Sequence, residues 1–154
     1  IERRATGMAP KTISASRIDS MRRKMKERGN WTDEELNSLS QQQWSFLDGQ
    51  HKLMHYKVIA EVVQINDHCD LQPKIGDKFV FNGGGILIPE ETTFPAICAW
   101  ALAGIMPLTY MTIDRILADL DPNDIWRNQT TCIDNSIRNG GLGVVLFKVY
   151  CEKV

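Results

Sequence analysis

The sequence predicts an α+β fold in which a small antiparallel sheet packs against one central helix. Two segments rich in β-branched residues, 57–65 and 144–151, have the composition of strands. Between them lies an apolar stretch that begins at Phe94 and has helical spacing. The residues before this core are basic and helical in pattern. We therefore divide the chain into an N-terminal arm, 1–50, and a core domain, 51–154.

The arm begins with a strongly basic segment. Its first thirty residues contain nine Lys or Arg residues and three acidic ones. A helix is predicted over 16–28, because Ile18, Met21 and Met25 share one face and Gly29 provides a stop. This apolar face is narrow, so the helix needs another surface to pack against.

A second helix in the arm is predicted from its capping sequence. Thr32 and Glu35 have the spacing of a capping box. The apolar positions that follow extend the helix to Asp48, and Gly49 ends it. The two helices together predict a helical hairpin that reaches outward from the core.

The core is expected to contain strands at 57–65 and 78–81, a short third strand at 86–88, and a C-terminal strand at 144–151. The glycine-rich segment 82–85 fits a tight hairpin turn or bulge. Consecutive glycine N–H groups also form anion-binding nests. No Gly-Lys-Ser/Thr ending follows, which favours the turn.

The central helix is predicted to start near Phe94, with Thr93 as its N-cap and Pro95 in its first turn. Pro107 is expected to kink or split this helix near Ile105, since proline removes a backbone donor. One helix on one sheet leaves the second face of the sheet to bury. The arm or another subunit is the expected cover.

Length and charge limit the classes of function. A chain of 154 residues with 43% apolar residues and a net charge of -1 is typical of one globular domain. No apolar run reaches the roughly 20 residues needed to span a bilayer. No apolar segment follows the N-terminal arginines, so no secretory signal is expected and cytoplasm is the predicted location. No nucleic-acid or membrane partner is predicted.

Three cysteines are candidate ligands for a metal. Cys69 follows the first strand, Cys98 lies near the start of the central helix, and Cys132 precedes the last strand. Loops at one end of a small sheet, together with a helix N-terminus, can bring these thiols together. Such a cluster suits zinc or an iron–sulfur cluster, with His68 or Asp134 as a further ligand. The simpler interpretation is that each cysteine is a small buried hydrophobe.

Other candidate residues carry weaker signals. His51 and His55 are four residues apart, as in some zinc sites, but no Glu follows the first His, and a solvated linker is the favoured interpretation. Cys151 lies inside a predicted strand and is left out of any site. A small-molecule pocket between helix and sheet, lined by Trp100 and Tyr110, is a further possibility.

The cysteines and their neighbours also carry a resemblance. Cys69 with the Gly76-Asp77-Lys78-Phe79 segment, Ile97-Cys98-Ala99-Trp100-Ala101, Pro107, Cys132-Ile133-Asp134 and the closing strand resemble a family of small cysteine-motif conserved hypothetical proteins, found largely in anaerobic bacteria. The resemblance covers residues from about 57 to 154. It implies that the cysteines at 69, 98 and 132 belong to one pattern, to which Cys151 does not belong. The family has no settled activity, so the resemblance implies no reaction.

These observations favour an accessory protein or small subunit. We expect it to self-associate, or to bind a larger enzyme through the N-terminal arm, with a metal at the cysteine cluster as a further feature. The alternative is a small metal- or thiol-dependent enzyme, a hydrolase, lyase or redox protein, that uses Cys69, Cys98 and Cys132 directly. The two readings differ at Cys98, because a helix N-terminus stabilises a thiolate and makes it more nucleophilic.

Overall fold

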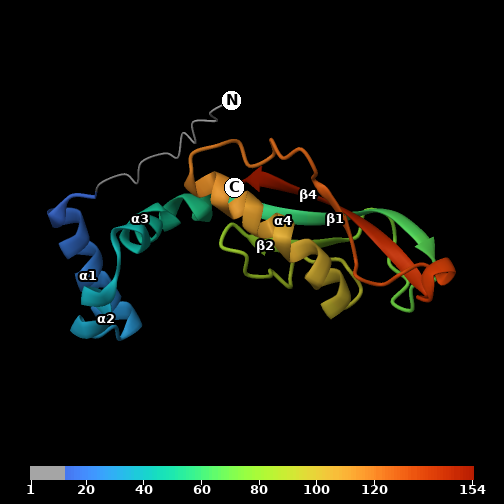
Figure 1. Ribbon diagram of the computed structural model, residues 1–154, viewed down its shortest axis with the longest axis horizontal. Helices are drawn as coiled ribbons and strands as arrows, with labels where there is room; N and C mark the ends of the chain where they lie inside the picture. The colour runs from blue at the N-terminus through green and yellow to red at the C-terminus, as the bar shows by residue number, and fades with distance from the viewer. Residues whose placement is uncertain (1–12) are drawn as a thin grey trace, which may run out of the picture. The chain divides into compact units, whose positions relative to one another are not determined.

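A computed structural model of the protein describes residues 13–154 (Figure 1). The predicted basic residues Arg3, Arg4 and Lys11 lie outside the described residues. The chain divides into two compact units after Gln50. Each unit is described by itself.

The first unit contains three α-helices, α1 (Ala15–Gly29), α2 (Asp33–Ser38) and α3 (Gln41–Gly49). The helix predicted over 16–28 is confirmed as α1. The hydroxyl of Ser14 caps it by accepting a hydrogen bond from the backbone N–H of Arg17. Asn30 ends it in the left-handed conformation, which asparagine tolerates better than most residues.

The second predicted helix is in fact two helices. Thr32 and Glu35 form the expected capping box at the start of α2. Leu39 then adopts an extended backbone, and Ser40 with Gln43 forms a second capping box that starts α3. Ser-x-x-Gln is itself a capping sequence, so a new helix begins there instead of the first one continuing. The prediction of one helix through to Asp48 was wrong at this break.

Polar contacts and two buried side chains hold this unit together. Leu36 and Trp44 are buried, and the guanidinium of Arg22 lies 5.4 Å from the centre of the Trp44 ring. Arg22 also donates to the side-chain oxygen of Asn37 at 2.8 Å. The capping box lowers the pKa of Glu35, mainly through the hydrogen bond from the Thr32 backbone N–H.

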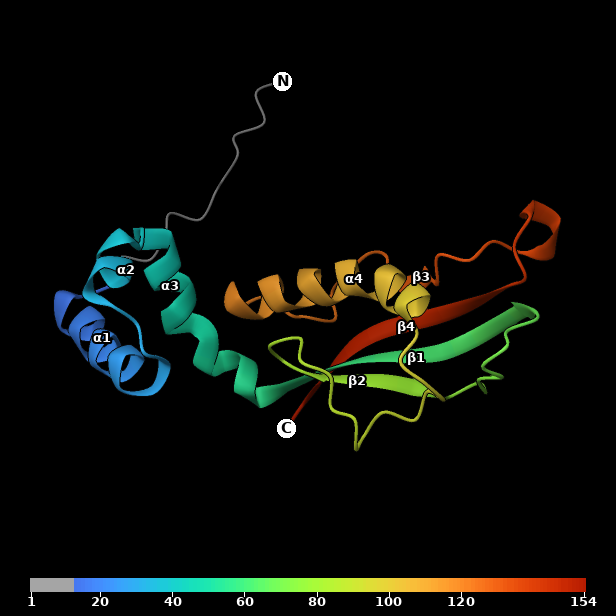
Figure 2. The ribbon, with the colours of Figure 1, turned by 90° about the horizontal axis from the view of Figure 1, so that it is seen from below.

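The second unit is an α+β domain with a four-stranded antiparallel sheet in the order β2-β1-β4-β3. A 3-10 helix, Gln50–His55, leads into it. The strands are β1 (Tyr56–Asp67), β2 (Lys78–Asn82), β3 (Gln129–Thr131) and β4 (Gly143–Lys153). Helix α4 (Ala99–Leu117) covers one face of the sheet, as Figure 2 shows from below. The fold class and three of the predicted strands are confirmed.

The predicted third strand at 86–88 does not form. Leu87 makes only an isolated bridge to Phe81. The segment after β2 instead follows the outer edge of that strand, where the backbone N–H groups of Lys78 and Val80 donate to the hydroxyl oxygens of Thr93 and Thr92. The 86–88 segment makes backbone hydrogen bonds to β2 only at Asn82 and Val80, and threonine side chains bond to the rest of this edge. The missed strand is the short β3, which has no strong β-branched run.

The central helix begins later than predicted. The backbone N–H of Phe94 donates to the carbonyl oxygen of Lys78, which holds this residue at the sheet edge and outside the helix. Cys98, not Thr93, is the N-cap residue. Pro107 lies inside α4, which continues through it as one helix and is not split.

The outer edge of β4 is also occupied. Beyond β3, the Val149 N–H donates to the carbonyl oxygen of Asn128 at 2.7 Å. The side-chain amide of Asn123 accepts from the Cys151 N–H at 2.7 Å and donates to the Cys151 carbonyl oxygen at 3.0 Å. The amide thereby copies the hydrogen bonding of a neighbouring strand.

The core lies between α4 and the sheet. Three of its phenylalanines form one cluster, in which the Phe79 ring centre lies 4.5 Å from that of Phe94 and 6.1 Å from that of Phe147. Phe79 and Phe147 are fully buried. Phe94 begins the segment that leads into Cys98 and α4. Because its ring belongs to this cluster and also lines the cavity of about 400 Å³, core packing positions one wall of that cavity.

Candidate functional site

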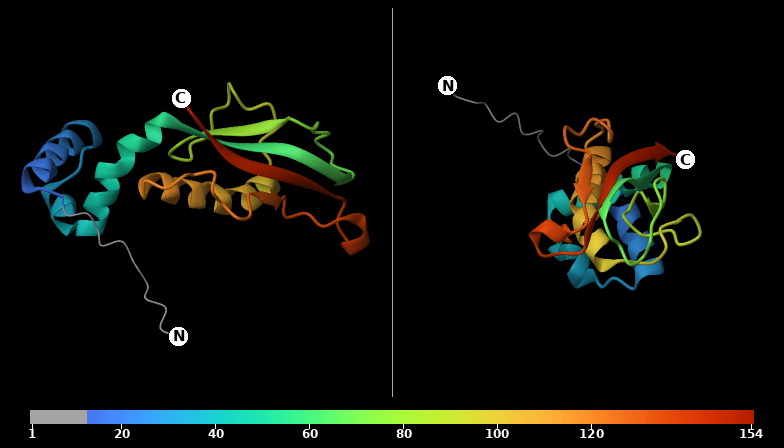
Figure 3. Two further views of the ribbon diagram at one scale, coloured as in Figure 1. Left: turned by 90° about the horizontal axis from the view of Figure 1, so that it is seen from above. Right: turned by 90° about the vertical axis from the view of Figure 1, so that its right-hand side faces the viewer.

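A cavity of about 400 Å³ lies at one end of the sheet, where β1 ends and β4 begins. Three segments that are distant in sequence line it, 68–71, 94–101 and 132–145. Figure 3 shows that the end of β1, the start of α4 and the start of β4 belong to the same end of this unit. The lining residues include His68, Cys69, Asp70, Leu71, Phe94, Cys98, Trp100, Ala101, Cys132, Asp134, the glycine-rich segment 140–143 and Val145. All three predicted cysteines and His68 therefore line one cavity.

Cys132 is the most constrained of these thiols. It is buried, and its backbone N–H donates to the carbonyl oxygen of Val145 at 3.0 Å. The Val145 N–H donates in return to the Cys132 sulfur at 3.4 Å. The Cys132 thiol in turn lies 4.0 Å from the Gly143 carbonyl oxygen, so backbone groups on two sides fix the position of its sulfur.

Cys69 and Cys98 are half-buried. Cys69 lies in the turn after β1, where its carbonyl oxygen accepts from the Gln72 N–H at 2.9 Å. Cys98 has an extended backbone, and its side chain makes no capping hydrogen bond to the helix. Both thiols are therefore more accessible than that of Cys132.

The segment 139–143 forms a wall of the cavity because its backbone packs against the loop after β1. The His68 N–H donates to the carbonyl oxygen of Leu142 at 3.2 Å. A Cβ on Gly143 would overlap the carbonyl oxygen of His68, so only glycine permits this approach. Sequence reasoning missed this role. The signal was the cluster of glycines just before a strand, at 140, 141 and 143.

Two carboxylates complete the polar part of the lining. Asp70 lies 2.8 Å from the ring nitrogen Nε2 of His68, and both side chains are exposed. Asp134 accepts from the backbone N–H groups of Asn135 and Gly143, at 2.7 and 3.4 Å. Asp134 therefore supports the loop, whereas His68 and Asp70 face solvent at the rim.

The donor chemistry of the cavity suits zinc, since thiolate and imidazole are its usual ligands. Across residues 13–154, however, no three His, Cys, Asp or Glu side chains are gathered closely enough to hold a metal ion as they stand. Metal binding at these residues would therefore need their side chains to rearrange.

The weaker candidates are placed elsewhere. His51 and His55 lie in the 3-10 helix that leads into β1, and both are exposed, as a solvated linker requires. Both line a second cavity of about 940 Å³ at the C-terminal end of α4, beside an ion pair of 2.6 Å between Lys52 and Asp119. Trp100 lines the thiol cavity as expected of a pocket between helix and sheet, whereas Tyr110 is not among the residues that line it.

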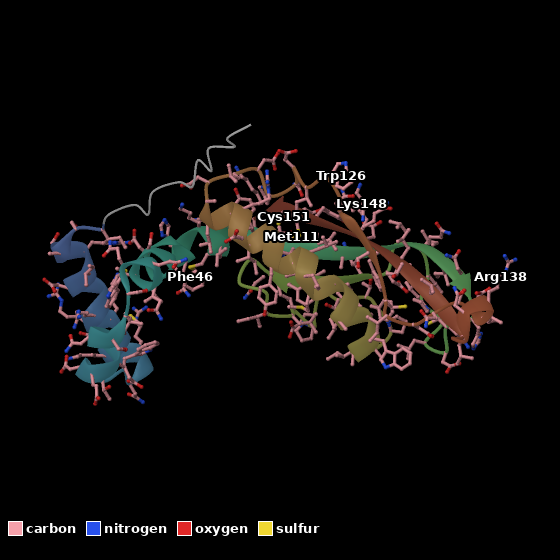
Figure 4. The ribbon with its side chains drawn as sticks, in the orientation of Figure 1. Phe46, Met111, Trp126, Arg138, Lys148 and Cys151 are labelled. Atoms are coloured by element: carbon pink, nitrogen blue, oxygen red, sulfur yellow. The ribbon has the colours of Figure 1, made fainter. Side chains whose placement is uncertain are left out.

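Cys151 lies outside the thiol cavity. Figure 4 shows it near the opposite end of β4 from Arg138. Burial, and to a lesser degree Asp121, raises the pKa of the Cys151 thiol to about 12. Burial and the hydrogen bond to Glu61 raise the pKa of Tyr150 to about 12 as well. Both groups are therefore neutral in the folded protein at ordinary pH.

These two raised pKa values predict a loss of stability at alkaline pH. The unfolded chain releases the thiol proton near pH 9 and the phenol proton near pH 10, whereas the folded chain keeps both to about pH 12. The free energy of unfolding should therefore fall as pH rises from 9 toward 12. Urea denaturation across this pH range measures the free energy of unfolding. The double variant Tyr150→Phe, Cys151→Ala should show a smaller decrease of this free energy with pH. An unchanged slope in the double variant would contradict the assignment.

No protein-family model matches the sequence, and no curated protein or solved structure matches it significantly. The resemblance to the cysteine-motif family therefore stays a prediction. No helix among residues 13–154 has the length and apolar character needed to cross a membrane.

Proposed function

We propose that this protein is an accessory binding protein, in which the 51–154 unit holds a thiophilic ligand in the thiol cavity and the arm attaches it to another chain. The observation that carries this proposal is the shared cavity of Cys69, Cys98 and Cys132, from three distant segments of the sequence. The alternative is that the three thiols meet only as small apolar groups, since Cys132 belongs to the core and Cys69 and Cys98 pack against it.

A zinc ion is the ligand that fits this donor set best. Three thiolates and one imidazole, that of His68, make a complete tetrahedral set for zinc. The hydrogen bond from the Val145 N–H, at 3.4 Å, holds the Cys132 sulfur in place at this cavity. An iron–sulfur cluster on the same three thiols is distinguished by its iron and sulfide content.

The arm supports association through charge. Arg17 and Lys26 of α1 form ion pairs within the arm, with Asp48 and Asp33. Arg23, Lys24 and Arg28 are exposed on the same helix. A partner surface rich in carboxylates complements these side chains, and its binding should weaken as salt increases. The partner is a second copy of this chain or a larger enzyme.

The test of the ligand is elemental analysis of protein purified without oxygen. We expect about one zinc per chain, and a cobalt-substituted form that shows the absorption of cobalt–thiolate bonds. Cys132→Ser and Cys69→Ser should each lower zinc affinity at least tenfold. Cys151→Ser is the matched control and should keep the metal, because Cys151 lies outside the cavity. Protein that binds neither zinc nor iron, with all its thiols titratable, would contradict the proposal.

The His68–Asp70 pair at the rim of the cavity favours a second candidate function, that of a small thiol-dependent enzyme. Asp70 holds the His68 imidazole at 2.8 Å, next in sequence to Cys69, and an oriented imidazole can act as a general base for a thiol. Under this reading, Cys98→Ser or Cys69→Ser abolishes turnover and leaves partner association intact. Unchanged turnover in both variants, with normal folding, would contradict this second function.

A further inference from the structure

The thiol cavity is larger than a metal ion requires. Its volume is about 400 Å³, which falls within the roughly 300–1,000 Å³ of pockets that hold small organic ligands. Zinc binds sulfur at about 2.3 Å, and a sphere of that radius has a volume of only about 50 Å³. Even with zinc at the cysteines, most of the cavity would stay accessible to a further ligand.

The buried part of the lining is apolar. Phe94, Ala101 and Val145 line the cavity and belong to the hydrophobic core. Cys132 belongs to the same core, and the half-buried Leu71 packs against it. Thiols behave as small apolar groups in such surroundings. The inner surface of the cavity therefore favours hydrocarbon over charged or strongly polar groups.

The rim continues this apolar surface to solvent. Trp100 at the start of α4 and Leu142 just before β4 both line the cavity. Their side chains are 55% and 59% exposed. An aromatic ring and an aliphatic side chain around an apolar interior are typical of small-molecule sites.

The charged groups of the lining are already engaged. Among the described residues that line the cavity, none is Lys or Arg. The carboxylate of Asp70 lies 2.8 Å from the His68 ring nitrogen. The carboxylate of Asp134 accepts hydrogen bonds from the backbone N–H groups of Asn135 and Gly143. An anionic ligand would lose its hydration here without meeting a lysine or arginine, and such burial of charge is unfavourable.

We propose that the thiol cavity binds a neutral, mainly apolar organic molecule, whose body packs against the buried lining and Trp100. The volume sets the size of this ligand, the core residues set its apolar character, and the charges of the lining select a neutral molecule over an anion. The inference goes beyond the function proposed above, because it holds with or without zinc at the cysteines.

The test uses two fluorescent dyes with the same rings. N-phenyl-1-naphthylamine is neutral, whereas 8-anilino-1-naphthalenesulfonate adds a sulfonate, and both become brighter in apolar surroundings. On the full-length protein, the neutral dye should saturate a site with a dissociation constant at least about tenfold below that of the sulfonate. Its binding should persist after metal is removed with a chelator. Equal affinity for the two dyes, or no saturable binding of the neutral dye, would overturn the proposal.

Two variants at the rim locate the bound dye. Leu142→Asp adds a charge to the apolar rim, and Trp100→Ala removes the aromatic ring, so each should weaken binding of the neutral dye about tenfold. The matched controls are Ile137→Asp and Tyr110→Ala. Ile137 is 60% exposed and Tyr110 64%, and neither is among the described residues that line the cavity. With folding verified by circular dichroism, equal losses in variants and controls would place the dye elsewhere and overturn the proposal.

Zinc content measured on the same samples keeps the two proposals apart. Binding of the neutral dye without any binding of zinc would support the organic ligand and contradict the metal at the cysteines. Binding of zinc without saturable binding of the dye would support the metal and overturn the organic ligand.

Discussion

Gly104→Ala is expected to destabilise the 51–154 unit by about 2–4 kcal/mol, although glycine to alanine in a helix ordinarily stabilises by about 1 kcal/mol. A Cβ at position 104 would overlap the carbonyl oxygen of Thr131 in β3. The Thr130 hydroxyl also donates to the Gly104 carbonyl oxygen at 3.0 Å, so helix and strand are held in close contact. The added methyl group must push β3 away from α4.

Denaturation with urea measures the stability loss, and the thiols give a second readout. Because Cys132 directly follows β3, its displacement should make it react faster with a thiol reagent. Gly84→Ala is the control, because the atom nearest to its added Cβ would be the side-chain oxygen of Asn82, at 3.3 Å. Its effect should stay within about 0.5 kcal/mol. A stabilised Gly104→Ala protein would show that α4 and β3 do not approach as described.

Phe147→Ala should cost about 3–5 kcal/mol, because its ring is fully buried and leaves a cavity that the core cannot close. Its ring centre lies 5.7 Å from that of Phe94, which lines the thiol cavity. The loss of packing around Phe147 should therefore also disturb the thiol cavity. Zinc binding at the cysteines should weaken together with the stability of the fold.

Phe46→Ala provides the matched control for Phe147→Ala. Phe46 belongs to α3 in the first unit, where Figure 4 labels it, and it is exposed. Its removal should change stability by less than about 1 kcal/mol. Equal losses in the two variants, measured by chemical denaturation, would contradict the core described above.

Local sequence signals predicted the elements that local interactions form. The capping box at Thr32, the helix α1 and the strand composition of β1, β2 and β4 were all visible in the sequence. The failures arose where non-local contacts decide. Phe94 is held at the sheet edge by Lys78, and the edge of β2 is filled by threonine hydroxyls, so neither outcome could be inferred from neighbouring residues.

The candidate site was predictable in part for the same reason. The places of Cys69, Cys98 and Cys132, in loops beside strands and at a helix start, suggested one end of the sheet, and they do line one cavity there. The wall at 139–143 could not be predicted, because it depends on backbone contact between two loops. Side-chain directions, on which metal binding depends, are likewise set by packing that no spacing rule describes.

Hydrogen bonds from within the chain occupy the edge of β2 at Lys78 and Val80, through Thr93 and Thr92, and the edge of β4 at Cys151, through Asn123. An open border is where strands from other chains add and where fibrils grow. This domain therefore has no free border for runaway polymerisation at those positions.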